Sequence, residues 1–282
     1  MSDIITKIGN SEIQHGIMNN RIYLMNLDAD DLPGILTELD RLAFNKKYTK
    51  IFAKIPESSK CYFLDQGYQQ EAIIPGFFNG KETGLFMCKF FSLDRRQTRN
   101  MEKIDESLLL VKNIKTSNDA FKIGDEYTIE KCLVSDIPYM CVVFNKLFST
   151  YPFPIHDPLY LKKTMNENVS YFCVKNKDGE IVALSSSEID YENKNVEMTD
   201  FATLRVYRGH SFAAKLLYSM EKEIEKSGII TSYTIARAVL PAMNITFAKL
   251  GYSYGGLLIN NTNISGQIES MNVWYKTLKS NG

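Results

Sequence analysis

The sequence lacks the residue patterns of a metalloprotein, a disulfide scaffold and a membrane protein. Its 282 residues contain five scattered cysteines without a CxxC pair, and the odd number favours free, mostly buried thiols in a reducing compartment. Its three histidines are isolated, which argues against zinc. No apolar run reaches ~18 residues, and no basic segment followed by an apolar stretch opens the chain. We therefore expect no metal ion and a cytoplasmic location.

Net charge is also lacking, because 33 basic residues balance 33 acidic ones and no long run of one sign occurs. This balance argues against nucleic acid and against a membrane surface as the main partner. We expect a small-molecule partner instead. The sequence does not indicate the oligomeric state.

Apolar residues make up 44% of the chain, which at this length fills two cores of ordinary size. A polar stretch at residues 94–126 is the predicted boundary. It separates an N-terminal α/β domain, residues 1–120, from a second domain, residues 121–282. No phosphate-binding loop occurs in the first domain, so we predict no cofactor there. Its predicted elements are strands at residues 21–27 and 50–55 and a helix at residues 30–44, capped by Asp30 or Asp31 with Pro33 in its first turn.

The second domain has clearer signals. Asp136 and Pro138 begin a helix with one apolar stripe, and Asp178-Gly179 indicates a hairpin turn. A loop with three prolines, residues 151–158, cannot be regular structure. The predicted fold is α+β, a mixed sheet flanked by helices. Its predicted helices are residues 137–148, 211–226 and 242–250, and its strands are residues 170–175, 180–189, 196–204, 231–237, 252–259 and 270–278.

The segment RVYRGHSFA, residues 205–213, lies between a predicted strand and a predicted helix. A basic, glycine-containing turn at this place directs unpaired N–H groups and the positive end of a helix dipole toward an anion. The segment therefore predicts a phosphorylated ligand.

This order of elements, with a phosphate loop after the third strand, resembles the GNAT N-acetyltransferase superfamily over roughly residues 127–278. The acetyl-CoA loop of that superfamily reads Gln/Arg-x-x-Gly-x-Gly/Ala, and RGHSFA matches it except that Ser211 replaces the central glycine. Serine is a good helix cap, so we expect the loop to persist. The resemblance implies acetyl-CoA as co-substrate, held by Arg208, Gly209, His210, Ser211, Phe212 and Ala213.

A second superfamily element appears in the run MNITFAKLGY. The resemblance implies that Asn244 bonds the pantetheine arm. Phe247 stands where the superfamily often has the tyrosine that protonates the leaving thiolate, so a standard acid is missing and we expect Phe247 to pack against the cofactor. Tyr252, Tyr254 and Tyr275 are candidates to replace it, with a framework role as the alternative for each. For the thioester carbonyl and the pantetheine amides, the resemblance implies backbone groups of the third strand, from Phe201, Ala202 and Thr203.

A closer resemblance is to the β-lysine N-acetyltransferases. It rests on the runs YPFPIHDP, EMTDFAT, YRGHSFA, MNITFAKLGYSYGG and ESMNVWYK, and GYQQEAIIPGFFNG extends it into the first half. Those enzymes acetylate the side-chain (ε) amine of β-lysine to make a zwitterionic compatible solute. The resemblance implies the same reaction here, by direct attack of the amine on the thioester. Arg205 stands where that family usually has a proline.

Acetyl transfer needs a neutral amine, and a lysine-like ammonium has an ordinary pKa of ~10.4. A carboxylate acting directly or through water can take the proton. Glu197 and Asp200 are the catalytic candidates. Three residues apart on a strand they face opposite sides, so we expect one to be the base and the other to orient the substrate. The alternative is two solvated carboxylates on a half-exposed strand. No cysteine is placed for an acyl-enzyme.

Substrate-binding candidates follow from the charges of β-lysine. Arg237 is placed to hold a carboxylate as a fork, with an internal salt bridge as the alternative. Glu188 and Glu269 are candidates for the second ammonium, although both are expected at the surface. Tyr151 and Phe153 are expected to line the pocket or to pack ordinarily.

Two further alternatives remain open at the level of the sequence. In the first alternative, the substrate is another small amine, such as lysine or a polyamine. In the second, the chain is a non-catalytic acyl-CoA-binding or sensing module. Ser211 and Phe247 favour the module, whereas Glu197 and Asp200 count against it. The first half is also interpreted as a degenerate copy of the same fold, because its FLDQGY echoes FAKLGY.

Overall fold

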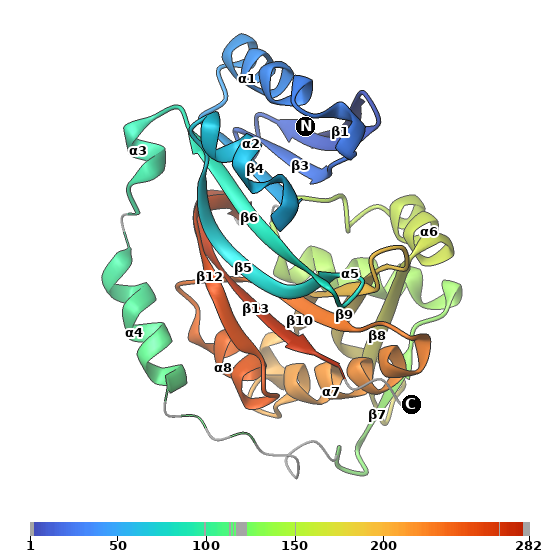
Figure 1. Ribbon diagram of the computed structural model, residues 1–282. Helices are drawn as coiled ribbons and strands as arrows, with labels where there is room; N and C mark the ends of the chain where they lie inside the picture. Colours follow the sequence, from blue (N-terminus) through green and yellow to red (C-terminus); the bar gives the residue numbers. More distant parts are fainter. Residues whose placement is uncertain are drawn as a thin grey trace.

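The computed structural model describes residues 3–98, 100–112, 114, 116, 123–149, 151–264 and 266–278. Through these residues runs one mixed sheet in the order β1-β2-β3-β4-β6-β5-β12-β13-β11-β10-β9-β8-β7. The first half of the chain supplies one end of the sheet and the second half the other, and β5 pairs with β12 where they meet (Figure 1). The division into residues 1–120 and 121–282 stays a prediction, because the sheet continues across it.

The first half contains the two predicted strands and the predicted helix. The helix begins later than predicted, because the side chain of Asp28 accepts from the Asp30 N–H in a short 3-10 turn and Pro33 then caps α1. Within the predicted polar boundary, α4 forms and packs against α8. The elements are β1 (Ile4–Ile8), β2 (Ser11–Gly16), β3 (Arg21–Asn26), α1 (Gly34–Lys46), β4 (Lys50–Pro56), α2 (Lys60–Asp65), β5 (Gln69–Phe78), β6 (Glu82–Phe90), α3 (Leu93–Arg96) and α4 (Met101–Lys112).

Every helix and strand predicted for the second half is present. Two elements were missed: β7, and α6, which begins at the last proline of YPFPIHDP and is capped by Asp157. The elements are β7 (Tyr127–Lys131), α5 (Ile137–Leu147), α6 (Pro158–Glu167), β8 (Val169–Asn176), β9 (Ile181–Asp190), β10 (Asn195–Thr203), α7 (Phe212–Ile224), β11 (Thr231–Arg237), α8 (Pro241–Lys249), β12 (Ser253–Ile264) and β13 (Gln267–Thr277).

The two halves repeat one topology. β1-β2-β3-β4-β6-β5 has the strand order of β8-β9-β10-β11-β13-β12, and in both the third and fourth strands are the parallel pair. The echoing segments agree in detail: Phe63 and Tyr68 contact edge to face at 5.0 Å and 77°, and Phe247 and Tyr252 at 4.9 Å and 80°. The intervening Gly67 and Gly251 both have positive φ. These matches support the interpretation of the first half as a degenerate copy.

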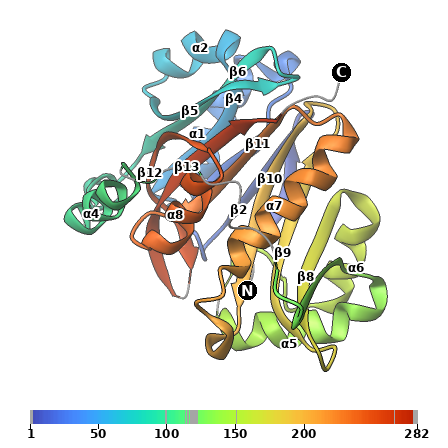
Figure 2. The same cartoon turned by 90° about the horizontal axis from the view of Figure 1, so that it is seen from below.

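Helices pack on both faces of the strands of the second half: α7 lies across one face (Figure 2), and α5 packs against β9 and β10 on the opposite face. A separate aromatic core joins the two halves through Tyr23, Phe52, Phe77, Phe86 and Tyr233. Burying each such side chain contributes about 1.5–3 kcal/mol. Since strands far apart in the sheet meet in this core, the sheet is curled and its inner face encloses the space between the halves.

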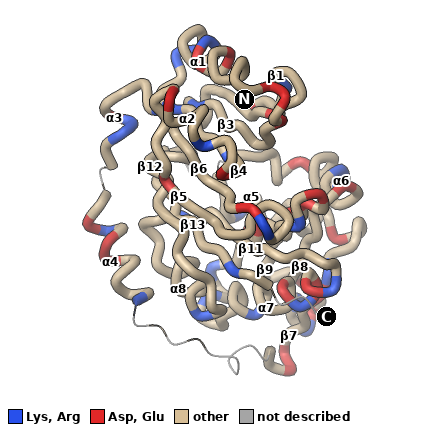
Figure 3. Tube along the Cα trace, in the orientation of Figure 1, with Lys and Arg blue, Asp and Glu red and all other residues tan. Residues whose placement is uncertain are grey.

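The described residues also show the state of the cysteines and the distribution of charge. All five cysteines lie within them and none forms a disulfide; three are buried, and Cys61 is exposed. Lys and Arg positions intermingle with Asp and Glu positions over both halves (Figure 3). In the described part of the chain no helix is both long and apolar enough to cross a membrane. The same residues contain no group of three His, Cys, Asp or Glu side chains arranged for a metal ion.

Candidate active site

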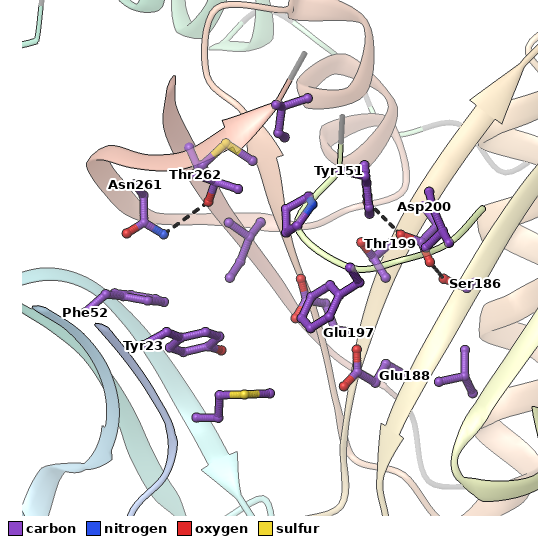
Figure 4. Close-up of a pocket in the computed structure, with 18 of the residues that line it drawn as sticks. Tyr23, Phe52, Tyr151, Ser186, Glu188, Glu197, Thr199, Asp200, Asn261 and Thr262 are labelled. Carbon is purple, nitrogen blue, oxygen red and sulfur yellow. Dashed lines mark hydrogen bonds between the residues drawn. The ribbon is translucent and has the colours of Figure 1, made fainter. Parts of the chain in front are cut away.

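A cavity of ≈ 110 Å³ lies between the two halves. The first half contributes aromatic and basic side chains to it, and the second half contributes three acidic ones and the loop before α6. In Figure 4, Tyr23 and Phe52 lie on one side of this space and the acidic residues on the other. The principal lining residues are Arg21, Tyr23, Phe52, Lys54, Tyr151, Phe153, Ser186, Glu188, Glu197, Thr199 and Asp200.

Glu197 and Asp200 both line this cavity, which corrects the expectation that they face opposite sides of β10. The reason is a β-bulge between Thr199 and Ala202. Asp200 adopts φ 54° there, so the alternation of side chains shifts and its carboxylate turns to the face that Glu197 occupies. A left-handed Asp is uncommon, and the bulge brings two carboxyl groups into one site.

Glu197 is paired directly across the sheet with Glu188. Both carboxyl groups are enclosed except where they face the cavity, so the expectation that Glu188 is a surface residue was wrong. Burial raises the pKa of Glu197 to about 7, Glu188 adds to this rise, and Lys54 and a hydrogen bond from Tyr233 oppose it. Burial also raises the pKa of Glu188, while Lys54 opposes the rise. Glu197 is therefore a carboxyl group that titrates near neutrality.

Lys54, from β4 of the first half, is the cation that compensates these carboxylates. Its Nζ lies 3.4 Å from the Tyr233 hydroxyl and 5.5 Å from the centre of the Tyr23 ring. Burial lowers the pKa of Lys54, but Tyr23, Glu197 and Glu188 outweigh burial and raise it. Lys54 therefore stays charged and partly compensates the negative charge of Glu188 and Glu197.

Asp200 is held by two hydroxyl groups. Tyr151 donates to its Oδ1 at 2.6 Å and Ser186 donates to its Oδ2 at 2.6 Å (Figure 4). Burial raises the pKa of Asp200, and these two hydrogen bonds oppose the rise. The carboxylate is thus fixed in orientation, with each oxygen already bonded once.

A second, smaller cavity adjoins the first where β10 and β11 diverge. The two strands pair only from Asn195 to Glu197, so among the described residues the later edge of β10 has no strand partner on that side. Phe201 lines this cavity and contacts Phe247 edge to face at 5.6 Å. Ala202 and Thr203 pair with β9 on the opposite edge of β10. The two cavities share Tyr151, Thr199, Asp200, Ile235, Ile264 and Met271.

The loop before α7 is open and exposed. Gly209 has φ 92° and Ser211 has φ 57°, and Ser211 makes no side-chain capping bond. Our reason for expecting the serine to be tolerated was therefore wrong: it occupies a left-handed position that favours glycine and does not act as a cap. The N–H groups of the first turn, from Phe212 and Ala213 onward, have no acceptor within the helix and can bind an anion. Among the loop side chains Arg208 is exposed, and His210 stacks on Phe212 at 5.3 Å.

Three expected roles find no support in the contacts of the structure, although Arg237 lines the second cavity. The Asn244 amide donates to the carbonyl oxygens of Arg237 and Leu240 and accepts from Asn272 and Trp274, which uses all of its capacity, so we do not assign it to the pantetheine arm. Arg237 forms the internal salt bridge, with Glu269, that the sequence left as the alternative to binding a carboxylate. Tyr252, Tyr254 and Tyr275 line neither cavity.

The sequence also missed Arg21, Tyr23, Lys54 and Tyr233. They stand on strands of both halves, far apart along the chain, and only the curled sheet brings them together. No local motif marks them. The one usable signal was the echo between FLDQGY and FAKLGY, because a repeated fold predicts that the first half presents its own inner face to the site.

Comparison with known proteins identifies the family. A family model described as "Acetyltransferase (GNAT) family" matches residues 140–252. The β-lysine N(6)-acetyltransferase of Methanococcus maripaludis is 40% identical over 96% of this chain and 98% of its own length. The chain belongs to the GNAT acetyltransferase family. Two further relatives, each 30% identical, are the N-acetyltransferase YodP of Bacillus subtilis (94% of this chain, 95% of its own) and the β-lysine N(6)-acetyltransferase of Methanosarcina mazei (85% and 95%).

As a GNAT acetyltransferase, the protein is an N-acetyltransferase that uses acetyl-CoA to acetylate an amine. The described residues fit this cofactor. The left-handed Gly209, at which an added Cβ would meet nothing within 4 Å, opens the loop at the N-terminus of α7. The later part of β10 precedes this loop in the chain, and the second cavity beside it is lined by Phe201 and Asp200.

Proposed function

We propose that this GNAT acetyltransferase acetylates the ε-amine of β-lysine and makes Nε-acetyl-β-lysine, a zwitterionic compatible solute. The observation that carries the proposal is the cavity between the halves. It sets three carboxyl groups against basic side chains in one small enclosed space, next to a channel suited to a pantetheine arm. β-Lysine has the complementary charges, one carboxylate and two amines. The 40% identity to a β-lysine N(6)-acetyltransferase supports the same substrate.

Glu197 is proposed as the base. At pH 7 an ordinary lysine-like ammonium loses its proton at a cost of about 4–5 kcal/mol. A carboxylate whose pKa is about 7 is matched to accept that proton near neutrality. Asp200 is proposed to orient the amine, because Tyr151 and Ser186 fix both of its oxygens.

Acetyl-CoA supplies the thioester carbonyl that the neutral amine attacks directly. The first-turn N–H groups of α7 with Arg208 are proposed to hold the phosphates. The free edge of β10 near Phe201 is proposed to pair with the pantetheine amides and to donate to the carbonyl oxygen. Phe247, buried beneath this edge, is proposed to pack under the arm.

The runner-up substrate is another small amine, such as lysine or a polyamine. The basic side chains inside the cavity disfavour a polyamine, since a polycation would have to approach Lys54 and Arg21 in a low-dielectric space. The non-catalytic module has no support in the family assignment.

The test is release of free CoA thiol by the purified protein with acetyl-CoA and β-lysine, α-lysine or spermidine. We expect release with β-lysine at the highest kcat/KM, and a product acetylated on the ε-amine by mass spectrometry and NMR. A higher kcat/KM with spermidine, or acetylation of the other amine, would overturn the substrate assignment.

A further inference from the structure

Arg21, the first residue of β3, is a buried cation at one end of the cavity. Its side chain lines the cavity although the residue is only 4% exposed. Its Nη1 donates to the carbonyl oxygen of Asn261 at 2.5 Å and to the Thr262 hydroxyl at 3.2 Å. The guanidinium also lies 5.3 Å from the centre of the Tyr23 ring and 5.5 Å from that of Phe52. It is therefore fixed in place by the walls of the cavity.

Within the described residues, no carboxylate forms an ion pair with Arg21. Its Nε is buried without a hydrogen-bond partner, and both of its hydrogen bonds to those residues leave from Nη1. Asp3 and Glu71 act on it only at longer range, and Glu71 is bound to Lys50. Burying an unpaired guanidinium is costly. Burial accordingly lowers the pKa of Arg21 to about 10.

The other buried arginine shows what a purely structural role looks like in this chain. Arg95 donates from Nε and Nη2 to backbone carbonyl oxygens of Asn260 and Asn19, and from Nη1 to the hydroxyl of Thr49. Each of its nitrogens is bonded. Arg21 differs because no acceptor among the described residues is bonded to its Nε or Nη2.

We propose that the guanidinium of Arg21 binds the carboxylate of the amino-acid substrate. This inference rests on the proposed function, which it deepens by stating how the enzyme recognises an amino acid and rejects a plain diamine. The planar guanidinium suits a carboxylate because its two donors match the two oxygens as a fork. Lys54 is not equivalent, since it already compensates Glu188 and Glu197.

The assignment orients the substrate along the cavity. Its carboxylate lies at the end formed by Arg21, Asn261 and Thr262, and its reacting amine lies at the end formed by Glu197 and Asp200, which adjoins the cofactor channel. The carboxylate end thus takes its cation from the first half, and the amine end lies in the half proposed to hold acetyl-CoA. The first half thereby supplies the cation that recognises the carboxylate.

The test compares β-lysine with the diamine that results when its carboxylate is removed. We measure kcat/KM for both substrates, and KM for acetyl-CoA, in the wild type and in Arg21→Met, Arg21→Lys and the control Arg237→Met. In Arg21→Met we expect the preference for β-lysine over the diamine to fall by about 100-fold, with KM for acetyl-CoA unchanged. Arg21→Lys should keep part of the preference, because it keeps the charge without the fork. Arg237→Met should keep all of it.

The outcomes distinguish a failure of the role assigned to Arg21 from a failure of the proposed function. If the wild type prefers β-lysine but Arg21→Met lowers kcat/KM equally for both substrates, Arg21 is structural and the inference is wrong while the proposed function stands. If Arg237→Met instead abolishes the preference, the carboxylate lies elsewhere. If the wild type does not prefer β-lysine, the proposed function itself fails. Circular dichroism and thermal unfolding confirm the fold; should Arg21→Met not fold, the same ratio in Arg21→Lys decides.

Discussion

Glu188 on β9 and Glu197 on β10 lie directly opposite each other in the antiparallel pair, with both carboxyl groups on the cavity. Like charges placed this way repel, and in an enclosed site they resist ionising together. The pair therefore couples the protonation of Glu197 to its neighbour.

Replacing the proposed base should lower the rate of acetyl transfer and leave the binding of acetyl-CoA nearly unchanged. We expect Glu197→Gln to lower kcat by about 100-fold or more, with KM for acetyl-CoA nearly unchanged. Asp200→Asn should lower kcat less and raise KM for the amine, because its role is to orient. Steady-state kinetics with both substrates varied measures this. Full activity of both variants at neutral pH would remove both residues from the mechanism.

The pH dependence of the wild type should follow Glu197. A base works only when deprotonated, so kcat/KM for the amine should rise with pH through about 7. In Glu188→Gln the neighbouring negative charge is gone, the pKa of Glu197 falls, and the rising limb moves to lower pH. Lys54→Met removes an opposing positive charge and should move it to higher pH. Shifts in the same direction in both variants would contradict the assignment.

Ser211 occupies a left-handed position, so the effect of replacing it should depend on whether the new side chain is branched at Cβ. We expect Ser211→Gly to keep the KM for acetyl-CoA and to change the free energy of unfolding by no more than about 1 kcal/mol, since relief of strain and loss of chain entropy oppose each other. Ser211→Val should destabilise the fold and raise that KM, because a β-branched side chain fits φ 57° poorly. Equal effects of the two would mean that the backbone here is not constrained.

Asn244 is expected to matter for stability and not for the cofactor. Asn244→Ala leaves the carbonyl oxygens of Arg237 and Leu240 and the donors of Asn272 and Trp274 without a partner. The free energy of unfolding should fall by about 2–4 kcal/mol, measured by urea denaturation. KM for acetyl-CoA should stay within about twofold of the wild type, because no hydrogen bond of Asn244 is left for a ligand. A selective rise in that KM with normal stability would restore the role in binding pantetheine.

Local patterns were enough for most elements of the second half, although they missed β7 and α6. Its helices and strands have clear starts, stops and periodicities, and the sequence placed them close to their bounds in the structure. They did not predict on which face of the sheet each side chain of β10 lies. The bulge at Asp200 is a left-handed residue inside a strand, and a period of two residues gives no warning of it. The same limit applies to Asn244, whose partners on β13 are distant in the chain.

The sequence by itself determined the family, and it predicted the cofactor loop and the two candidate carboxylates, because each is carried by neighbouring residues whose spacing is read directly. Only the tertiary structure decided that Glu197 shares a site with Asp200, that Arg237 is occupied by Glu269, and that Arg21 and Lys54 enter from the other half. These facts depend on strand register and on how a curled sheet brings distant strands together. Both are set by packing of the whole chain, and no local segment contains them.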